Sequence, residues 1–190
     1  AGECGRVVVV CPAALIGDWV RTIESQTSMT VATPSRSWGA ARRRGFYASD
    51  GAEAWVLNYE RFRLSDRDAI EGALAGSSPL FVLDEVQKVA NRASAMHRGL
   101  AKTVKAVGAA GVIALTATPM VRGPEDFYNE FRIVDSQVFG GVADFERDFT
   151  EMGGAKDQWG NYVGFRDLPY MHARAGAEVF SADKHRPEIA

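Results

Sequence analysis

Two adjacent carboxylates, Asp84 and Glu85, directly follow the apolar residues "FVL" at 81–83. Neighbouring negative charges repel each other, and burying them is costly unless a cation or hydrogen-bond donors stabilise them. A strand that ends in Asp-Glu suits nucleotide hydrolysis, in which the Asp binds Mg²⁺ and the Glu orients or deprotonates the attacking water. The alternative interpretation is a strand that ends in two solvated acids.

A pair of threonines follows another apolar run. The segment "ALTATPM" at 114–120 lies about 30 residues after the acidic pair, with one helical pattern between them. This spacing predicts neighbouring strand–helix units, and ligands of open α/β sheets bind beyond the carboxyl ends of the strands. Thr116 and Thr118 are therefore candidates to hydrogen-bond the acidic loop and to couple the nucleotide state to movement elsewhere. Without the acidic pair, the segment would be an ordinary Ser/Thr-rich turn.

Two further apolar runs end in residues that suit ligand contacts. The first, at 7–11, leads through Cys11 and Pro12 into a helix start whose amides can receive a phosphate. The second, at 54–57, leads into Asn58 and Tyr59. Taken singly, each of these segments is more often structural than functional.

The elements that must position these residues alternate between two patterns. Four apolar runs without polar alternation predict strands buried on both faces, as in parallel sheets. Helical patterns fall between them, so the sequence predicts a three-layer α/β sandwich with a mostly parallel sheet. The strands are expected at 7–11, 54–57, 80–83 and 112–115, with a weaker one at 29–33, and the helices at 14–25, 65–76, 93–107 and 123–134.

Composition restricts the classes of function. The net charge of −2 gives no overall attraction to nucleic acid, so any such binding must come from local patches. One such patch is the stretch 35–47, in which Arg42, Arg43 and Arg44 are interleaved with aromatic residues that can stack on bases. The alternative is a solvated loop with one or two rings packed onto the domain. No apolar run reaches the roughly 20 residues of a membrane span, which makes a cytoplasmic or nucleoid-associated protein the default expectation.

Taken together and in this order, the motifs resemble the first RecA-like lobe of a superfamily 2 helicase, and more narrowly the Swi/Snf-type DNA translocases with their DEAD/DEAH-like box. The resemblance is close over 7–140 and looser over 141–190. The segments that carry it are "VVCPAALIGDWVRTI" (motif Ia), "VLNYERFR" (motif Ib), "FVLDEVQKVANRASAMHRGL" (the DEAH-box segment) and "IALTATPMVRGPEDFYNEFRIVDSQVFG" (motif III and its continuation).

The resemblance implies roles for the residues of the nucleotide site. Asp84 would coordinate Mg²⁺ and Glu85 would act as the catalytic base for hydrolysis of ATP. Gln87 stands where most relatives have a histidine that bridges the nucleotide and motif III. Thr116 and Thr118 would couple the ATP site to the DNA track.

The resemblance also implies partners. Cys11, Pro12, Asn58 and Tyr59 stand where relatives grip the phosphodiester backbone, which suits a motor that moves on duplex DNA regardless of its sequence. A second RecA-like lobe of the same parent chain would supply the other half of the ATP site. No membrane partner is implied.

The chain departs from the family pattern in two respects. In the tail segment "VFSADKHRP", Ser181 and Ala182 stand where relatives carry paired arginines. A phosphate-binding G-x-x-x-x-G-K-[ST] loop is absent, and "GGAKD" at 153–157 is no substitute because it follows no strand. We therefore expect lobe one at 1–140, from motif Ia onward, and at 141–190 an irregular extension and linker towards the second lobe, with no ATP hydrolysis by this fragment alone. The alternatives are a motor subunit of a restriction system, an RNA helicase, and a non-hydrolysing lobe that binds DNA or protein.

Overall fold

The computed structural model describes residues 5–118, 120–121, 123–158 and 160–176, with only the backbone of residues 64, 65 and 172. The chain divides into two compact units, Ala1–Asp135 and Ser136–Ala190. The sequence places the division a few residues later, after 140. Each unit is described by itself below.

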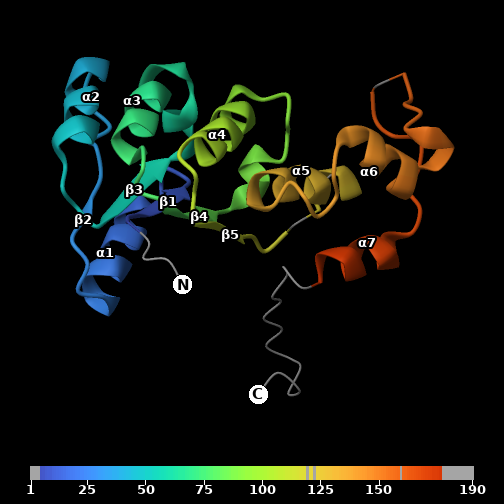
Figure 1. Ribbon diagram of the computed structural model, residues 1–190, viewed down its shortest axis with the longest axis horizontal. Coiled ribbons are helices and arrows are strands. Elements are labelled where there is room, and N and C mark those ends of the chain that lie inside the picture. The colour runs from blue at the N-terminus through green and yellow to red at the C-terminus, as the bar shows by residue number, and fades with distance from the viewer. Residues whose placement is uncertain (1–4, 119, 122, 159, 177–190) are drawn as a thin grey trace. The chain divides into compact units, whose positions relative to one another are not determined.

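The first unit is built on a five-stranded parallel sheet (Figure 1). The strand order is β2-β3-β1-β4-β5, so the chain crosses over between neighbours as it does in open α/β sheets. The predicted α/β fold with a parallel sheet is confirmed. The strands are β1 (Val7–Cys11), β2 (Val31–Ala32), β3 (Ala54–Asn58), β4 (Leu80–Asp84) and β5 (Gly111–Leu115).

Helices alternate with these strands as predicted, and the bounds of the four predicted helices agree with the sequence patterns to within a few residues. The helices of the first unit are α1 (Ile16–Gln26), α2 (Ala40–Ser49), α3 (Leu64–Leu74), α4 (Ala95–Ala106) and α5 (Pro124–Val134). Short 3₁₀ turns, η1 (Tyr59–Phe62) and η2 (Val86–Val89), follow β3 and β4 directly. The two turns therefore begin where the candidate functional residues lie.

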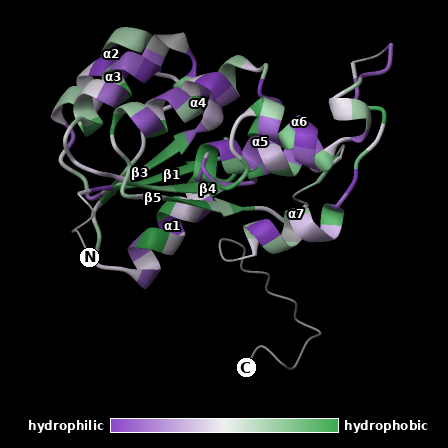
Figure 2. Ribbon diagram, turned by 45° about the vertical axis from the view of Figure 1, so that its right-hand side comes forward, coloured by the Kyte–Doolittle hydropathy of each residue, from purple (hydrophilic) through white to green (hydrophobic). Residues whose placement is uncertain are grey.

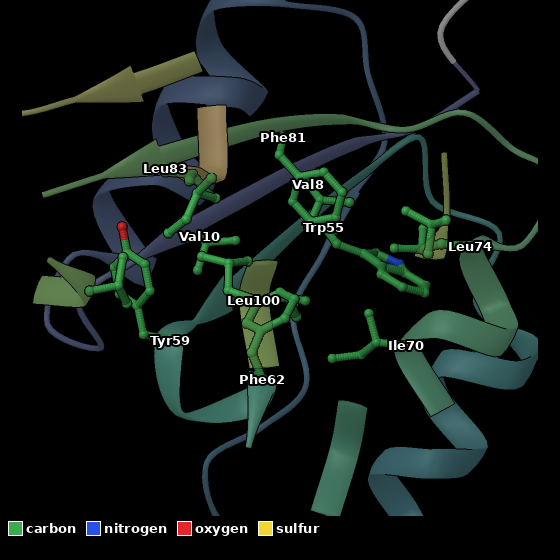
Figure 3. Close-up of a cluster of buried hydrophobic side chains, with 14 of the residues drawn as sticks. Val8, Val10, Trp55, Tyr59, Phe62, Ile70, Leu74, Phe81, Leu83 and Leu100 are labelled. Carbon is green, nitrogen blue, oxygen red and sulfur yellow. The ribbon is translucent and has the colours of Figure 1, made fainter. Parts of the chain in front are cut away.

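Side chains of the first unit pack on both faces of the sheet, which completes the predicted three layers. One face lies under α2, α3 and α4, where Trp55, Phe62 and Phe81 are among the fully buried side chains (Figure 3). The opposite face packs against α1 through Ile23. Figure 2 shows the strands hydrophobic along most of their length, whereas the helices carry hydrophilic residues as well.

The expectation of burial on both faces is wrong for β5. Val112 and Ala114 pack against the large core, but Ile113 and Leu115 are 47% and 39% exposed. The reason is position: β5 is the last strand in the order, whereas α1 packs on β2 and β3 at the other end. A continuous apolar run does not reveal which strand lies last.

Two helices lie where the sequence patterns predict none. The basic stretch 35–47, for which no helix was predicted, contains the start of α2, which packs Phe46 and Tyr47 against Trp55 and is tied to α3 by an ion pair described below. The tail expected as irregular contains α7 (Leu168–Ala175), with Pro169 in its first turn and Met171 and Ala175 buried one turn apart. Part of the expected linker, 177–190, lies outside the described residues.

The second unit is held by aromatic side chains. In its helix α6 (Val142–Phe149), Phe145 and Phe149 are fully buried with ring centroids 5.8 Å apart. The turn η3 (Glu151–Gly153) opens the glycine-rich segment, in which the ammonium group of Lys156 lies 4.7 Å from the centre of the Tyr162 ring. Among the described residues of both units, no helix is both long and apolar enough to cross a membrane.

Candidate functional site

The candidate residues meet at one edge of the sheet because all paired strands run in the same direction. Cys11 at the end of β1 pairs with Asn58 at the end of β3, and Asp84 at the end of β4 pairs with Leu115 at the end of β5. The residues that follow these strands therefore emerge along a single carboxyl edge. This is where ligands of open α/β sheets bind.

Glu85 occupies a backbone conformation that is uncommon for a residue with a side chain. Its φ and ψ are 55° and 50°, in the left-handed region, directly between β4 and the turn η2. Strained backbone of this kind clusters at functional sites, where it fixes the direction of a side chain. Within the described part of the chain, no Lys or Arg forms an ion pair with Asp84 or Glu85. Two adjacent carboxylates without a protein cation are suited to a ligand that brings positive charge.

Gln87 joins the acidic loop to the threonines after β5. Its side-chain amide donates to the Glu85 carboxylate, and its carbonyl oxygen accepts a 2.8 Å hydrogen bond from the Thr116 hydroxyl. The Thr116 hydroxyl oxygen in turn accepts from the backbone N–H of Thr118 at 3.0 Å. The predicted proximity of the acidic loop and the threonine segment is thus present, through Gln87 as the intermediate.

Asp84 receives two hydrogen bonds from other parts of the sheet edge. The indole N–H of Trp19, on α1, donates to its carboxylate at 2.8 Å, and the hydroxyl of Tyr59 donates to its backbone carbonyl at 2.8 Å. No functional role was predicted for Trp19. In the sequence, it lies one turn into the helix that follows the candidate residues Cys11 and Pro12, and this position alone does not show a contact with Asp84.

Two of the expected DNA-contacting side chains are buried. Cys11 is fully buried against α1, and burial, with the Asp84 charge, raises the pKa of its thiol to about 12. Tyr59 is 2% exposed, and burial together with the Asp84 charge raises the pKa of its phenol. The alternation of β1 and the packing of η1 turn these two side chains inward. Pro12 and Asn58 are partly exposed.

The segment after β3 is fixed from behind by α4. A Cβ atom at Gly99 would lie 1.8 Å from the carbonyl oxygen of Phe62, so only glycine permits this approach of helix and turn. Asn58 at the start of the segment donates a 2.6 Å side-chain hydrogen bond to Glu60. Asn58 is thus held on a rigid turn at the sheet edge.

The three arginines of the basic stretch have different environments. Arg43 makes a bidentate pair with Asp66, at 2.6 and 2.9 Å, and Tyr47 donates to the same carboxylate at 3.2 Å. Burial alone would raise the pKa of Asp66, but the hydrogen bonds and charge of Arg43 hold it below its usual value. Arg42 and Arg44 are exposed, and the Arg42 guanidinium lies 4.4 Å from the Trp38 ring. Arg43 is therefore structural, whereas Arg42 and Arg44 face solvent.

A buried carboxyl group on α5 was not found from the sequence. Glu130 is 4% exposed, and its Oε1 has no hydrogen-bond partner among the described residues. Burial, reinforced by the neighbouring charge of Asp126, raises its pKa from 4.5 to about 8. Sequence patterns place Glu130 on an amphipathic helix but do not show that it points inward.

This burial predicts a pH dependence of stability. Folded Glu130 keeps its proton up to about pH 8, whereas the unfolded chain releases it near pH 4.5, so the folded state binds more protons between these values. The Glu130 contribution therefore falls as pH rises through this window, by a few kcal/mol. A Glu130→Gln variant is expected to gain stability over the wild type at pH 8 and little at pH 5, measured by urea unfolding. The exposed control Glu24→Gln is expected to differ from the wild type by the same free energy of unfolding at pH 5 and pH 8. The same result for Glu130→Gln would contradict the raised pKa of Glu130.

The donor set at the sheet edge fits a magnesium ion held by nucleotide phosphates. Mg²⁺ usually keeps several waters and takes one or two carboxylates plus phosphate oxygens, not a complete cage of protein ligands. Asp84 and Glu85 supply carboxylates, and no group of three metal-binding side chains occurs among the described residues. Two adjacent carboxylates thus fit the protein's share of such a site.

Known structures resemble this chain in fold. The fold is similar to that of the Sulfolobus solfataricus SWI2/SNF2 ATPase core in complex with dsDNA, with a TM-score of 0.68 and 17% identity over 98% of this chain and 36% of that chain. The Mycobacterium smegmatis helicase Lhr bound to ssDNA and AMP-PNP gives a TM-score of 0.48 and 24% identity over 70% of this chain and 19% of that chain. A search of curated proteins finds no match.

The similarity to the Sulfolobus solfataricus core shows a RecA-like α/β ATPase-core fold. The sequence matches the family model of the SNF2-related domain over residues 2–162. The chain therefore belongs to the SNF2-related domain family, as the resemblance predicted. It spans 36% of the length of the archaeal core that it matches.

Proposed function

We propose that this chain is the first motor lobe of an ATP-dependent translocase that moves on duplex DNA. The observation that carries the proposal is the connected set Glu85–Gln87–Thr116 beside Asp84, at the carboxyl edge of a parallel sheet. It combines two carboxylates without a protein cation and a hydrogen-bonded link to the next strand. Membership of the SNF2-related domain family supports the same class of activity.

The residues have distinct tasks in this proposal. Asp84 would hold Mg²⁺, which neutralises charge on the phosphates when it is bound. Glu85 would orient the attacking water and accept its proton, for which the left-handed backbone at this residue fixes the carboxylate. Gln87 and Thr116 would transmit the state of the site to the loop after β5 through their 2.8 Å hydrogen bond.

The proposed DNA contacts lie along the same edge and on α2. Pro12 follows β1 and Asn58 ends β3, and Arg42 and Arg44 are exposed cations of the basic stretch. Contacts of this kind go to phosphates and carry no sequence information, which suits a motor that must step along any sequence. The archaeal core of similar fold was solved in complex with dsDNA.

A second RecA-like lobe and a phosphate-binding loop are needed for hydrolysis in this proposal. The described residues contain neither, so the chain by itself is expected to be inactive. The whole protein is therefore the object of the test.

The test is ATP turnover by the intact protein, with Mg²⁺, in the presence and absence of duplex DNA. Turnover is expected to rise by about tenfold or more with DNA, which corresponds to about 1.4 kcal/mol in activation free energy. Single-stranded DNA and double-stranded RNA of the same length serve as controls for the partner. Stimulation by RNA alone would favour an RNA helicase, and no turnover with any nucleic acid would favour a non-hydrolysing binding lobe; either result would overturn the proposal.

A further inference from the structure

Trp19 links the helix after β1 to the acidic pair. Helix α1 begins a few residues after Pro12, and the indole N–H of Trp19 donates a 2.8 Å hydrogen bond to Oδ2 of Asp84. The two residues are 65 positions apart in the sequence. The Trp19 ring is only partly exposed and packs on the core beneath α1. A charge-assisted bond from a packed ring fixes one oxygen of this carboxylate and leaves the other available.

Tyr59 makes a second link to Asp84. It follows β3, and β1 lies between β3 and β4. Its ring lies in the large buried cluster, together with Leu83 (Figure 3), and its hydroxyl donates a 2.8 Å hydrogen bond to the backbone carbonyl of Asp84. Asn58, the residue before it, is held on the sheet edge. The backbone and the side chain of Asp84 are thus each bound by one donor from outside β4.

Both donors come from segments to which we assign contacts with DNA. Trp19 lies on the helix that follows Pro12, and Tyr59 directly follows Asn58. Because Cys11 and Asn58 pair across β1 and β3, the two segments are neighbours, and β1 lies between β3 and β4. A small displacement of either segment would alter a hydrogen bond to Asp84, since packed interiors transmit shifts and do not absorb them.

We infer that Trp19 and Tyr59 are positioning residues that couple DNA binding to the nucleotide site through Asp84. The inference rests on the proposed function and adds a route separate from the one through Gln87 and Thr116. DNA held by the segments after β1 and β3 would favour one orientation of the Asp84 carboxylate, and bound nucleotide with Mg²⁺ would favour the same orientation. By linkage, each ligand then raises the affinity of the protein for the other by the same factor.

The test measures this coupling at equilibrium, without turnover. The intact protein is titrated into a fluorescent duplex, with and without a non-hydrolysable ATP analogue and Mg²⁺, and the ratio of the two dissociation constants is the coupling factor. The wild type is expected to show a factor of roughly 5 to 150. Tyr59→Phe removes only the hydroxyl donor, and Trp19→Phe removes the indole N–H together with part of the packed ring; both are expected to lower the factor several-fold towards one. A structural defect that lowers DNA affinity equally with and without the ATP analogue leaves the ratio of dissociation constants unchanged. Such a defect therefore does not reproduce the expected loss of coupling.

Two matched controls remove similar hydrogen bonds elsewhere. Trp55→Phe deletes the 2.7 Å bond from the indole to Asp50, and Tyr162→Phe deletes the 2.9 Å bond from the hydroxyl to Glu146. Both controls are expected to keep the wild-type coupling factor. The inference is overturned if Trp19→Phe and Tyr59→Phe also keep it, or if the controls lower it as much. A wild-type factor of one would also overturn the inference, whereas the proposed function stands or falls with DNA-stimulated turnover, so the two failures are distinguishable.

Discussion

A Glu85→Gln variant of the intact protein is expected to lose DNA-stimulated ATP turnover by about 10²- to 10⁴-fold, the usual contribution of a general base. The substitution keeps the shape of the side chain, but an amide does not accept a proton from water. The Glu85 carboxylate accepts a hydrogen bond from Gln87, and the amide oxygen of the new glutamine can accept the same bond. The measurement is steady-state turnover at saturating duplex DNA.

The interpretation of this result depends on two controls. Glu24→Gln, an exposed change of the same chemical type on α1, is expected to have wild-type turnover. DNA affinity without nucleotide is expected to be unchanged in Glu85→Gln, which separates a lost base from a lost fold. Turnover of Glu85→Gln within about tenfold of the wild type would remove Glu85 from the role of base, since a general base contributes at least 10²-fold.

The second large effect is on stability. Arg43→Ala is expected to lower the free energy of unfolding by about 3–5 kcal/mol, because it leaves the fully buried Asp66 carboxylate without its bidentate partner. Arg61 lies 3.5 Å from the same carboxylate and would compensate only in part. The measurement is urea unfolding followed by circular dichroism.

Arg42 and Arg44 provide the matched comparison within the same helix. Both are exposed, so Arg42→Ala and Arg44→Ala are expected to change stability by less than about 0.5 kcal/mol. If Arg42 and Arg44 contact phosphates, each substitution is expected to reduce the steepness of log DNA affinity against log salt concentration by about one. A loss of stability in Arg43→Ala as small as that in Arg42→Ala would show that Asp66 does not depend on Arg43.

Much of the fold followed from local patterns. Continuous apolar runs such as 7–11 and 80–83 predict parallel strands because both of their faces need covering, and the helical patterns between them supply the cover. Helix α2 was not predicted because its contacts come from distant segments: Arg43 pairs with Asp66 on α3, and Tyr47 packs against Trp55 on β3. The exposure of Ile113 was not predicted either, because an apolar run does not show where its strand lies in the sheet.

The sequence by itself determined which residues follow each strand, and a parallel sheet then brings their ends to one edge. It therefore predicted that Asp84, Glu85 and Thr116 lie near one another. Only the tertiary structure decided which side chains hold them. The bond from Trp19 to Asp84 and the burial of Glu130 depend on how α1 and α5 pack, and packing between distant segments has no local signature in the sequence.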